Sequence, residues 1–91
     1  MSEQQIQKTI LNYLKELDQT YSFKVIVANR KGIPDIIVCY KGRFIAFEVK
    51  TTKGKATELQ KLNLRQIEDA GGKAYVVRSV EEVKECLAKL S

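Results

Sequence analysis

The chain has 91 residues, of which 44% are hydrophobic, with a net charge of +5 and no histidine. This length predicts a single domain over residues 1–91, and the absence of histidine excludes serine–histidine and cysteine–histidine triads and histidine metal sites. No apolar run approaches the roughly 20 residues of a membrane span, and the polar N-terminus has no signal-peptide pattern. We therefore expect a cytoplasmic protein without membrane contact.

The positive charge and a pI near 9.3 favour a polyanionic partner, and basic residues are densest between Lys41 and Arg65. Charge alone leaves nucleic-acid binding and an ordinary basic surface equally open. Cys39 falls in an apolar run and Cys86 on the apolar stripe of a helix, without CxxC spacing. We expect both to be reduced core residues and not zinc ligands.

Helical spacing of apolar residues predicts an amphipathic helix over residues 2–18, with Ser2 as a plausible N-cap. Phe23–Ala28 is β-branched and apolar, which predicts a strand. Residues 29–34 are basic and contain glycine and proline, which is typical of a connection.

Two further strand-like runs, Ile36–Tyr40 and Arg43–Val49, are separated by Lys41-Gly42, which indicates a tight hairpin turn. A polar, basic loop follows over residues 51–55. A capping-box pattern from Thr57 then predicts a helix that continues to the Gly71-Gly72 pair.

Residues 73–78 are predicted to form a fourth strand, and a second capping-box pattern from Ser79 opens a last helix with Val80, Val83, Leu87 and Leu90 inward. The order is α-β-β-β-α-β-α. No repeat or linker interrupts it, so one compact α/β sandwich is expected.

The hairpin turn fixes which residues face one another. A two-residue loop at Lys41-Gly42 pairs Tyr40 with Arg43, and every later pair keeps the same residue-number sum, which makes Asp35 face Glu48. A four-residue loop preserves this register, whereas a three-residue loop breaks it. Opposed like charges destabilise a sheet, so we expect a divalent cation to offset the repulsion. Oxygen-only ligands suit Mg²⁺ or Mn²⁺ and not Zn²⁺.

Three other polar residues are candidates for the same site. Lys50 lies two residues beyond Glu48, on the same strand face, and could stabilise a phosphate or orient a metal-activated water; a simple ion pair with Glu48 is the alternative. Glu3 extends the buried stripe of the first helix, although a first-turn dipole partner or a frayed end is equally open. Gln60 could bind water or phosphate, or could serve only in the capping box.

Together these residues resemble the PD-(D/E)XK nuclease superfamily and, within it, the VRR-NUC family. The resemblance rests on Glu3, Gly32-Ile33-Pro34-Asp35, Glu48-Val49-Lys50 and Gln60, and it extends over Ala70-Gly71-Gly72 and the stretch from Val77 to Glu82. It implies a restriction-endonuclease-like α/β core, with a central mixed sheet flanked by helices, and metal-dependent hydrolysis of phosphodiester bonds.

The resemblance also implies roles for single residues. Asp35, Glu48 and the backbone carbonyl of Val49 would bind Mg²⁺ or Mn²⁺, Lys50 would be the catalytic lysine, and Glu3 and Gln60 would complete the active site. Short family members are typically viral or bacterial and similar to homodimeric enzymes that cut Holliday junctions. We therefore expect an endodeoxyribonuclease of replication or repair, bacterial or phage-encoded, that acts as a homodimer on branched or four-way-junction DNA.

Four basic residues are candidates for contacts with the DNA backbone: Lys31, Lys53, Lys55 and Arg65. The loop from Lys53 to Lys55 is alternatively ordinary solvated surface. Two other functions stay open: an inactive nucleic-acid-binding module or partner subunit on the same fold, and a protein–protein adaptor. Cleavage assays separate the first from a nuclease, and DNA binding at low salt separates the second.

Overall fold

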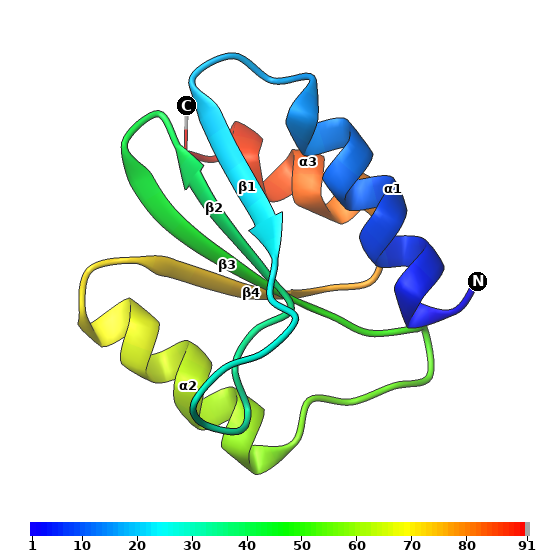
Figure 1. Ribbon diagram of the computed structural model, residues 1–91, viewed down its shortest axis with the longest axis vertical. Coiled ribbons are helices and arrows are strands. Elements are labelled where there is room, and N and C mark those ends of the chain that lie inside the picture. Colours follow the sequence, from blue (N-terminus) through cyan, green and yellow to red (C-terminus); the bar gives the residue numbers. More distant parts are fainter. Residues whose placement is uncertain (91) are drawn as a thin grey trace.

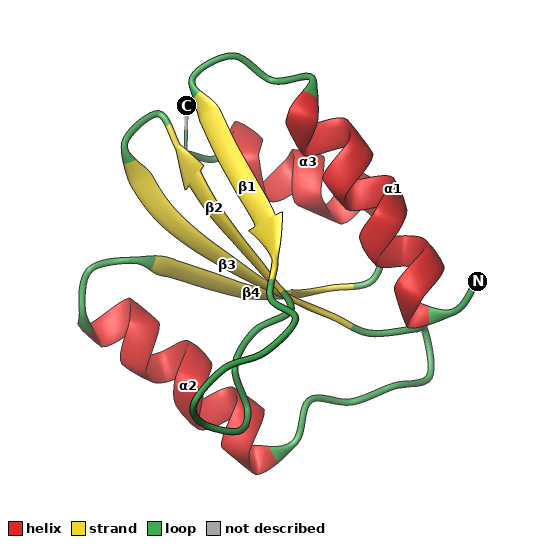
Figure 2. Ribbon diagram, viewed as in Figure 1, coloured by secondary structure: helices red, strands yellow, loops and turns green. Residues whose placement is uncertain are grey.

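The computed structural model describes residues 1–90, and these form three helices and one four-stranded mixed sheet (Figures 1 and 2). In chain order the elements are α1 (Glu3–Lys15), β1 (Thr20–Lys24), β2 (Ile36–Tyr40), β3 (Arg43–Val49), α2 (Glu58–Asp69), β4 (Lys73–Val77) and α3 (Val80–Ala88). The sheet order is β1-β2-β3-β4, with antiparallel pairing from β1 to β3 and parallel pairing between β3 and β4. The predicted element order and the mixed sheet are confirmed.

The β2–β3 hairpin has the predicted register. Tyr40 pairs with Arg43 and Ile36 pairs with Phe47. Lys41 and Gly42 both have positive φ, at 51° and 83°, as a two-residue turn of the I′ type requires. This turn matches the twist of the strands, so the same register continues to the open end of the hairpin.

The helices divide between the two faces of the sheet. In Figure 1, α1 and α3 lie on one face and α2 on the other. The core lies between the sheet and the α1–α3 pair, and its fully buried members come from every element except β1 and α2; they include Ile10, Leu14, Ile36, Val38, Ile45, Phe47, Val49, Val77 and Val83. Over the described residues, no helix is long and apolar enough to cross a membrane.

The N-caps of the helices are those predicted from the sequence, with one difference. Ser2 and Thr57 each form a reciprocal capping box with the glutamine three residues later. Ser79 accepts the N–H of Glu82, but the Glu82 carboxylate accepts the N–H of Arg78 at 2.8 Å and not that of Ser79. The second capping box is therefore only half formed.

The first strand lies earlier than predicted. It was expected at Phe23–Ala28, but β1 ends at Lys24, and only Val25 adds one further bond, from its N–H to the carbonyl of Asp35 at 2.8 Å. The reason is its partner: Lys24 pairs with Ile36, the first residue of β2. Beyond that point β1 has no neighbouring strand, so residues 26–28 leave the sheet despite their β-branched sequence.

Part of the α2 face of the sheet is uncovered. Tyr21, Cys39 and Phe44 lie opposite one another on neighbouring strands, hence on one face. Because α2 packs mainly against β4 and less against β3, all three side chains are exposed. The prediction that Cys39 is a core residue is therefore wrong, since its strand buries only the opposite face.

Candidate functional site

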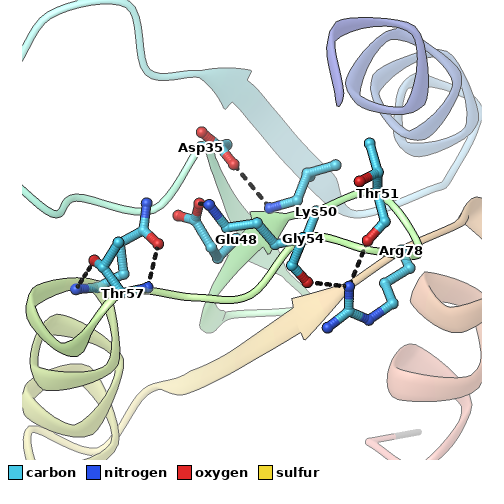
Figure 3. A network of polar contacts seen from close by, with 9 residues as sticks. Asp35, Glu48, Lys50, Thr51, Gly54, Thr57 and Arg78 are labelled. Carbon is cyan, nitrogen blue, oxygen red and sulfur yellow. Dashed lines mark hydrogen bonds and ion pairs between the residues drawn. The ribbon is translucent and has the colours of Figure 1, made fainter. Parts of the chain in front are cut away.

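Asp35 sits at the open end of the hairpin, one residue before β2, and is half-buried. Its backbone carbonyl accepts the N–H of Val25, and its Oδ2 accepts the N–H of Val49 at 2.7 Å. The carboxylate therefore bonds to β3, across the hairpin, at the point where Glu48 is placed (Figure 3).

Glu48, the penultimate residue of β3, is a buried carboxyl group with only 2% of its surface exposed. Its Oε2 lies 3.5 Å from Lys50 Nζ, whereas its Oε1 is buried without a hydrogen-bond partner. Burial, followed by the nearby charge of Asp35, raises the pKa of Glu48 from 4.5 to about 7, and Lys50 opposes this rise only in part. The predicted meeting of two acids is thus present, and their repulsion is incompletely balanced.

Lys50 directly follows β3, and its side chain is 12% exposed. It lies two residues after Glu48 and points to the same side of the sheet, as predicted. The ammonium group is the one cation that an ion pair links to Glu48 over residues 1–90. A largely buried ammonium group beside the Glu48 carboxylate is placed to balance negative charge on a bound group.

The donor set fits a hard divalent cation. Asp35 and Glu48 offer carboxylate oxygens on one face, and one of these oxygens is buried and unpartnered, a costly state that a bound cation would relieve. Val49 has its side chain in the core on the opposite face, so only its backbone carbonyl could join the ligands. These groups are those that Mg²⁺ and Mn²⁺ prefer.

Gln60 lies in the first turn of α2, and its position in the site stays a prediction. Its Oε1 accepts the N–H of Thr57 at 2.9 Å, and its own N–H bonds to the Thr57 hydroxyl at 3.1 Å. The capping role is therefore established. Because the cap uses only the oxygen of the carboxamide, the two Nε2 donors take no part in it.

Glu3 opens α1, on the sheet face opposite α2, and is half-buried. Between residues 1 and 90, no three Asp, Glu, Cys or His side chains lie close enough to share a metal ion. The structure therefore does not bring Glu3 together with Asp35 and Glu48 in one ligand cluster. Its first-turn position is that of a helix-dipole partner, and its catalytic role stays a prediction.

The four basic candidates are all exposed, but they fall into two groups. Lys31 belongs to the loop that leads into Asp35, and Lys53 and Lys55 belong to the loop that follows Lys50. Arg65 lies on α2, two residues after the buried Asn63, and hence about 200° away around the helix. The loop lysines belong to the segments that precede Asp35 and follow Lys50 in the sequence, whereas Arg65 faces away from the loop that packs on α2.

Sequence reasoning missed the residues that hold these two loops. The guanidinium of Arg78 donates to the carbonyls of Thr51 and Gly54 and so fixes the loop after Lys50 (Figure 3). Arg30 and Asn63 bond the other loop to α2. The register of Val49 with Val77 could have placed Arg78 beside Lys50, but no local signal joins Arg30 to a helix 33 residues away.

The fold and the site together define a class of protein. A mixed four-stranded sheet whose β2–β3 hairpin has Asp35 directly before one strand and Glu-x-Lys at the end of the other has a PD-(D/E)XK nuclease-type fold, with the restriction-endonuclease-like core that the motif predicts.

The family is then shown directly. The sequence profile of the VRR-NUC domain matches residues 1–81, so the chain belongs to the VRR-NUC family. A solved structure described as "VRR_NUC domain" is similar, with a TM-score of 0.80, 24% identity and 94% of each chain covered. A second, "VRR_NUC domain protein", has a TM-score of 0.76 and 18% identity over 97% of this chain and 86% of that one. At these identities the structures establish the fold alone. No curated protein sequence matches the chain.

Proposed function

We propose that this chain is a metal-dependent endonuclease that hydrolyses phosphodiester bonds in DNA. The observation that carries the proposal is the buried Glu48 carboxyl group beside half-buried Asp35 and Lys50, with one Glu48 oxygen unpartnered and the pKa of Glu48 raised to about 7. A fold-stabilising role does not account for such a pair, because burying like charges costs free energy. Functional sites are where such arrangements gather.

Each residue has a task that follows from its contacts. Asp35, Glu48 and the Val49 carbonyl would hold Mg²⁺ or Mn²⁺, which supplies a polarised phosphate and a bound water of lowered pKa. The N–H of Val49 orients the Asp35 carboxylate at 2.7 Å, which leaves its other oxygen for a ligand. Lys50 donates to the attacking water or to a phosphate oxygen and balances charge in the transition state.

The DNA backbone would be bound by the loops on both sides of the site. Lys31, Lys53 and Lys55 are exposed on these loops, and phosphate contacts of this kind give salt-sensitive binding without reading sequence. Arg65 would contribute only to a substrate that extends around α2. Recognition by shape suits branched DNA, so we propose a four-way junction as the preferred substrate.

A second copy of the chain would cover the open part of the α2 face. Large apolar side chains are exposed on or next to β1 and on β3: Tyr21 by 72%, Phe23 by 47%, Ile26 by 78%, Val27 by 86% and Phe44 by 49%. At roughly 200 Å² per fully exposed aromatic side chain, the three aromatic residues expose roughly 340 Å², and Ile26 and Val27 add to this area, toward the ~800 Å² that each partner gives to a standard interface. An apolar face favours contact with another apolar face over contact with phosphates. A two-fold assembly would also supply two active sites for the two strands.

Cleavage of a four-way junction and of linear duplex, with and without Mn²⁺, tests the nuclease. Lys50→Met removes the ammonium group and should abolish cutting while the fold and DNA binding persist. Lys84→Met is the matched control, because Lys84 is an exposed lysine on α3, on the other face of the sheet. Binding without cleavage by the wild-type protein would favour the inactive DNA-binding module instead.

Sedimentation velocity tests the dimer. The wild-type protein should sediment as a dimer, and Tyr21→Ser combined with Phe23→Ser should shift it to a monomer, because both side chains lie on the exposed face of β1. A monomeric wild-type protein would contradict this assembly without affecting the proposed chemistry at Asp35 and Glu48.

A further inference from the structure

The loop that leads into Asp35 is tied to α2 by a small polar network. Arg30 Nη2 donates to Asn63 Oδ1 and to Gln66 Oε1, both at 2.9 Å. Asn63 Nδ2 donates back to the carbonyl of Lys31 at 3.3 Å. The network therefore joins the chain just before the candidate metal ligand to a helix more than thirty residues further along.

Asn63 is the only buried residue that α2 contributes, with 4% of its surface exposed. Its third bond runs to the Leu59 carbonyl of its own helix at 3.0 Å, so both bonds of the Asn63 side chain to residues outside α2 go to the loop. Burying an amide without partners costs about 1–3 kcal/mol. Asn63 is thus favourable at this position only while the loop is in place.

Gly32 packs against the same part of α2. A Cβ atom at this position would lie 2.7 Å from Leu59 Cγ and 2.8 Å from Asn63 Nδ2, and the residue has φ of +81°. Only glycine combines this close approach with a left-handed backbone. Asp35 follows three residues later, after the buried Pro34. The position of the loop on α2 therefore determines where Asp35 lies.

The two candidate ligands are held in unequal ways. Glu48 lies inside β3, between β2 and β4, and its place is set by the sheet. Asp35 lies before the first residue of β2, and its bonds to the sheet are those of its carbonyl with Val25 and of its Oδ2 with Val49. Asp35 is therefore the less restrained of the two, and its position depends on the loop that precedes it.

We propose that Arg30 and Asn63 are positioning residues for the metal site. They clamp the loop to α2 and thereby hold Asp35 opposite Glu48 before a cation binds. The proposal rests on the proposed function for its effect on metal binding, but the clamp itself acts on the metal-free protein. Mutation of residues that hold metal ligands in position typically lowers metal affinity by 10–100-fold.

The test compares two arginines that carry the same charge. Arg30→Met breaks the clamp from an exposed position, and Arg65→Met removes an exposed arginine from the far side of α2. By calorimetry, Arg30→Met should weaken Mn²⁺ binding about tenfold, and Arg65→Met should leave it unchanged. At saturating Mn²⁺ the cleavage rate of Arg30→Met should recover toward that of the wild type, since the clamp is not part of the chemistry.

A second measurement needs no metal. The N–H of Val49 is bonded to Asp35 Oδ2, so its hydrogen-exchange protection in EDTA reports where Asp35 lies. Arg30→Met should lower this protection while the amides of buried Val38 and Ile45 stay protected. Unchanged Val49 protection in Arg30→Met would overturn the clamp. If the wild type binds no Mn²⁺, the proposed function fails, yet the Val49 exchange still decides whether the clamp exists.

Discussion

Replacing Glu48 by glutamine should make the metal-free protein more stable above neutral pH. The side chain is buried, one of its oxygens has no partner, and its pKa is raised to about 7, first by burial and then by the charge of Asp35. Glutamine has nearly the same shape and stays neutral. The substitution therefore removes a buried charge that does not stabilise the metal-free folded protein.

The size of the effect follows from the pKa. Because the folded protein holds a proton on Glu48 up to about pH 7, whereas the unfolded chain releases it near pH 4.5, the folded state binds more protons between these values. The stability of the wild type therefore falls as pH rises through this window and stays low above it. At about 1.4 kcal/mol per tenfold change in proton affinity, the loss is about 3 kcal/mol, or roughly 10–20 °C in Tm for a domain of this size.

Urea unfolding in EDTA, followed by circular dichroism from about pH 4 to about pH 8, measures this difference. The free energy of unfolding of Glu48→Gln should match that of the wild type below pH 4.5 and exceed it above pH 7. Glu85→Gln, which changes an exposed glutamate of α3, should follow the wild type at every pH. A glutamine variant that is less stable than the wild type above neutral pH, or a gap that does not change with pH, would refute the reasoning.

Adding Mn²⁺ at about a thousand times its dissociation constant should reverse the order, because only the wild type retains both carboxylates and a ligand at that concentration adds about 4.1 kcal/mol, more than the loss of about 3 kcal/mol. Gly32→Ala should lower the free energy of unfolding by about 2–3 kcal/mol in urea titrations, since a methyl group meets α2 at 2.7 Å in a left-handed backbone. Arg78→Met frees the loop after Lys50, and trypsin should then cut at Lys53 and Lys55 faster than in the wild type. Lys53→Gln with Lys55→Gln should weaken DNA binding and reduce the slope of log affinity against log salt by about 2.

The hairpin could be predicted from the sequence because the length of its turn determines which residues pair. Once Lys41-Gly42 is a two-residue turn, the register brings Asp35 to Glu48 without any knowledge of the remaining chain. The helix caps could also be predicted from the sequence, since a capping box joins residues that are only three positions apart.

The errors arise where distant partners decide the outcome. The bounds of β1 depend on where β2 begins, and no local pattern in residues 23–28 contains that information. On α2, Leu59 is exposed by 45% and Leu62 by 41%, and the buried residue is Asn63. Apolar spacing alone could not find this arrangement, because Asn63 is buried by a loop whose contacts are polar.

The two halves of the site should respond differently to mutation, and the fold explains why. Glu48 belongs to a strand with neighbours on both sides, so changes there alter the stability of the whole domain while the geometry persists. Asp35 depends on a loop that Arg30 anchors from an exposed position, so changes in the anchor should alter ligand placement at little cost to the core. Metal affinity and folding stability should therefore change in different proportions: substitutions at position 30 should lower metal affinity about tenfold, while their effect on stability should not exceed the ~1–3 kcal/mol of the Asn63 amide that loses its Arg30 partner.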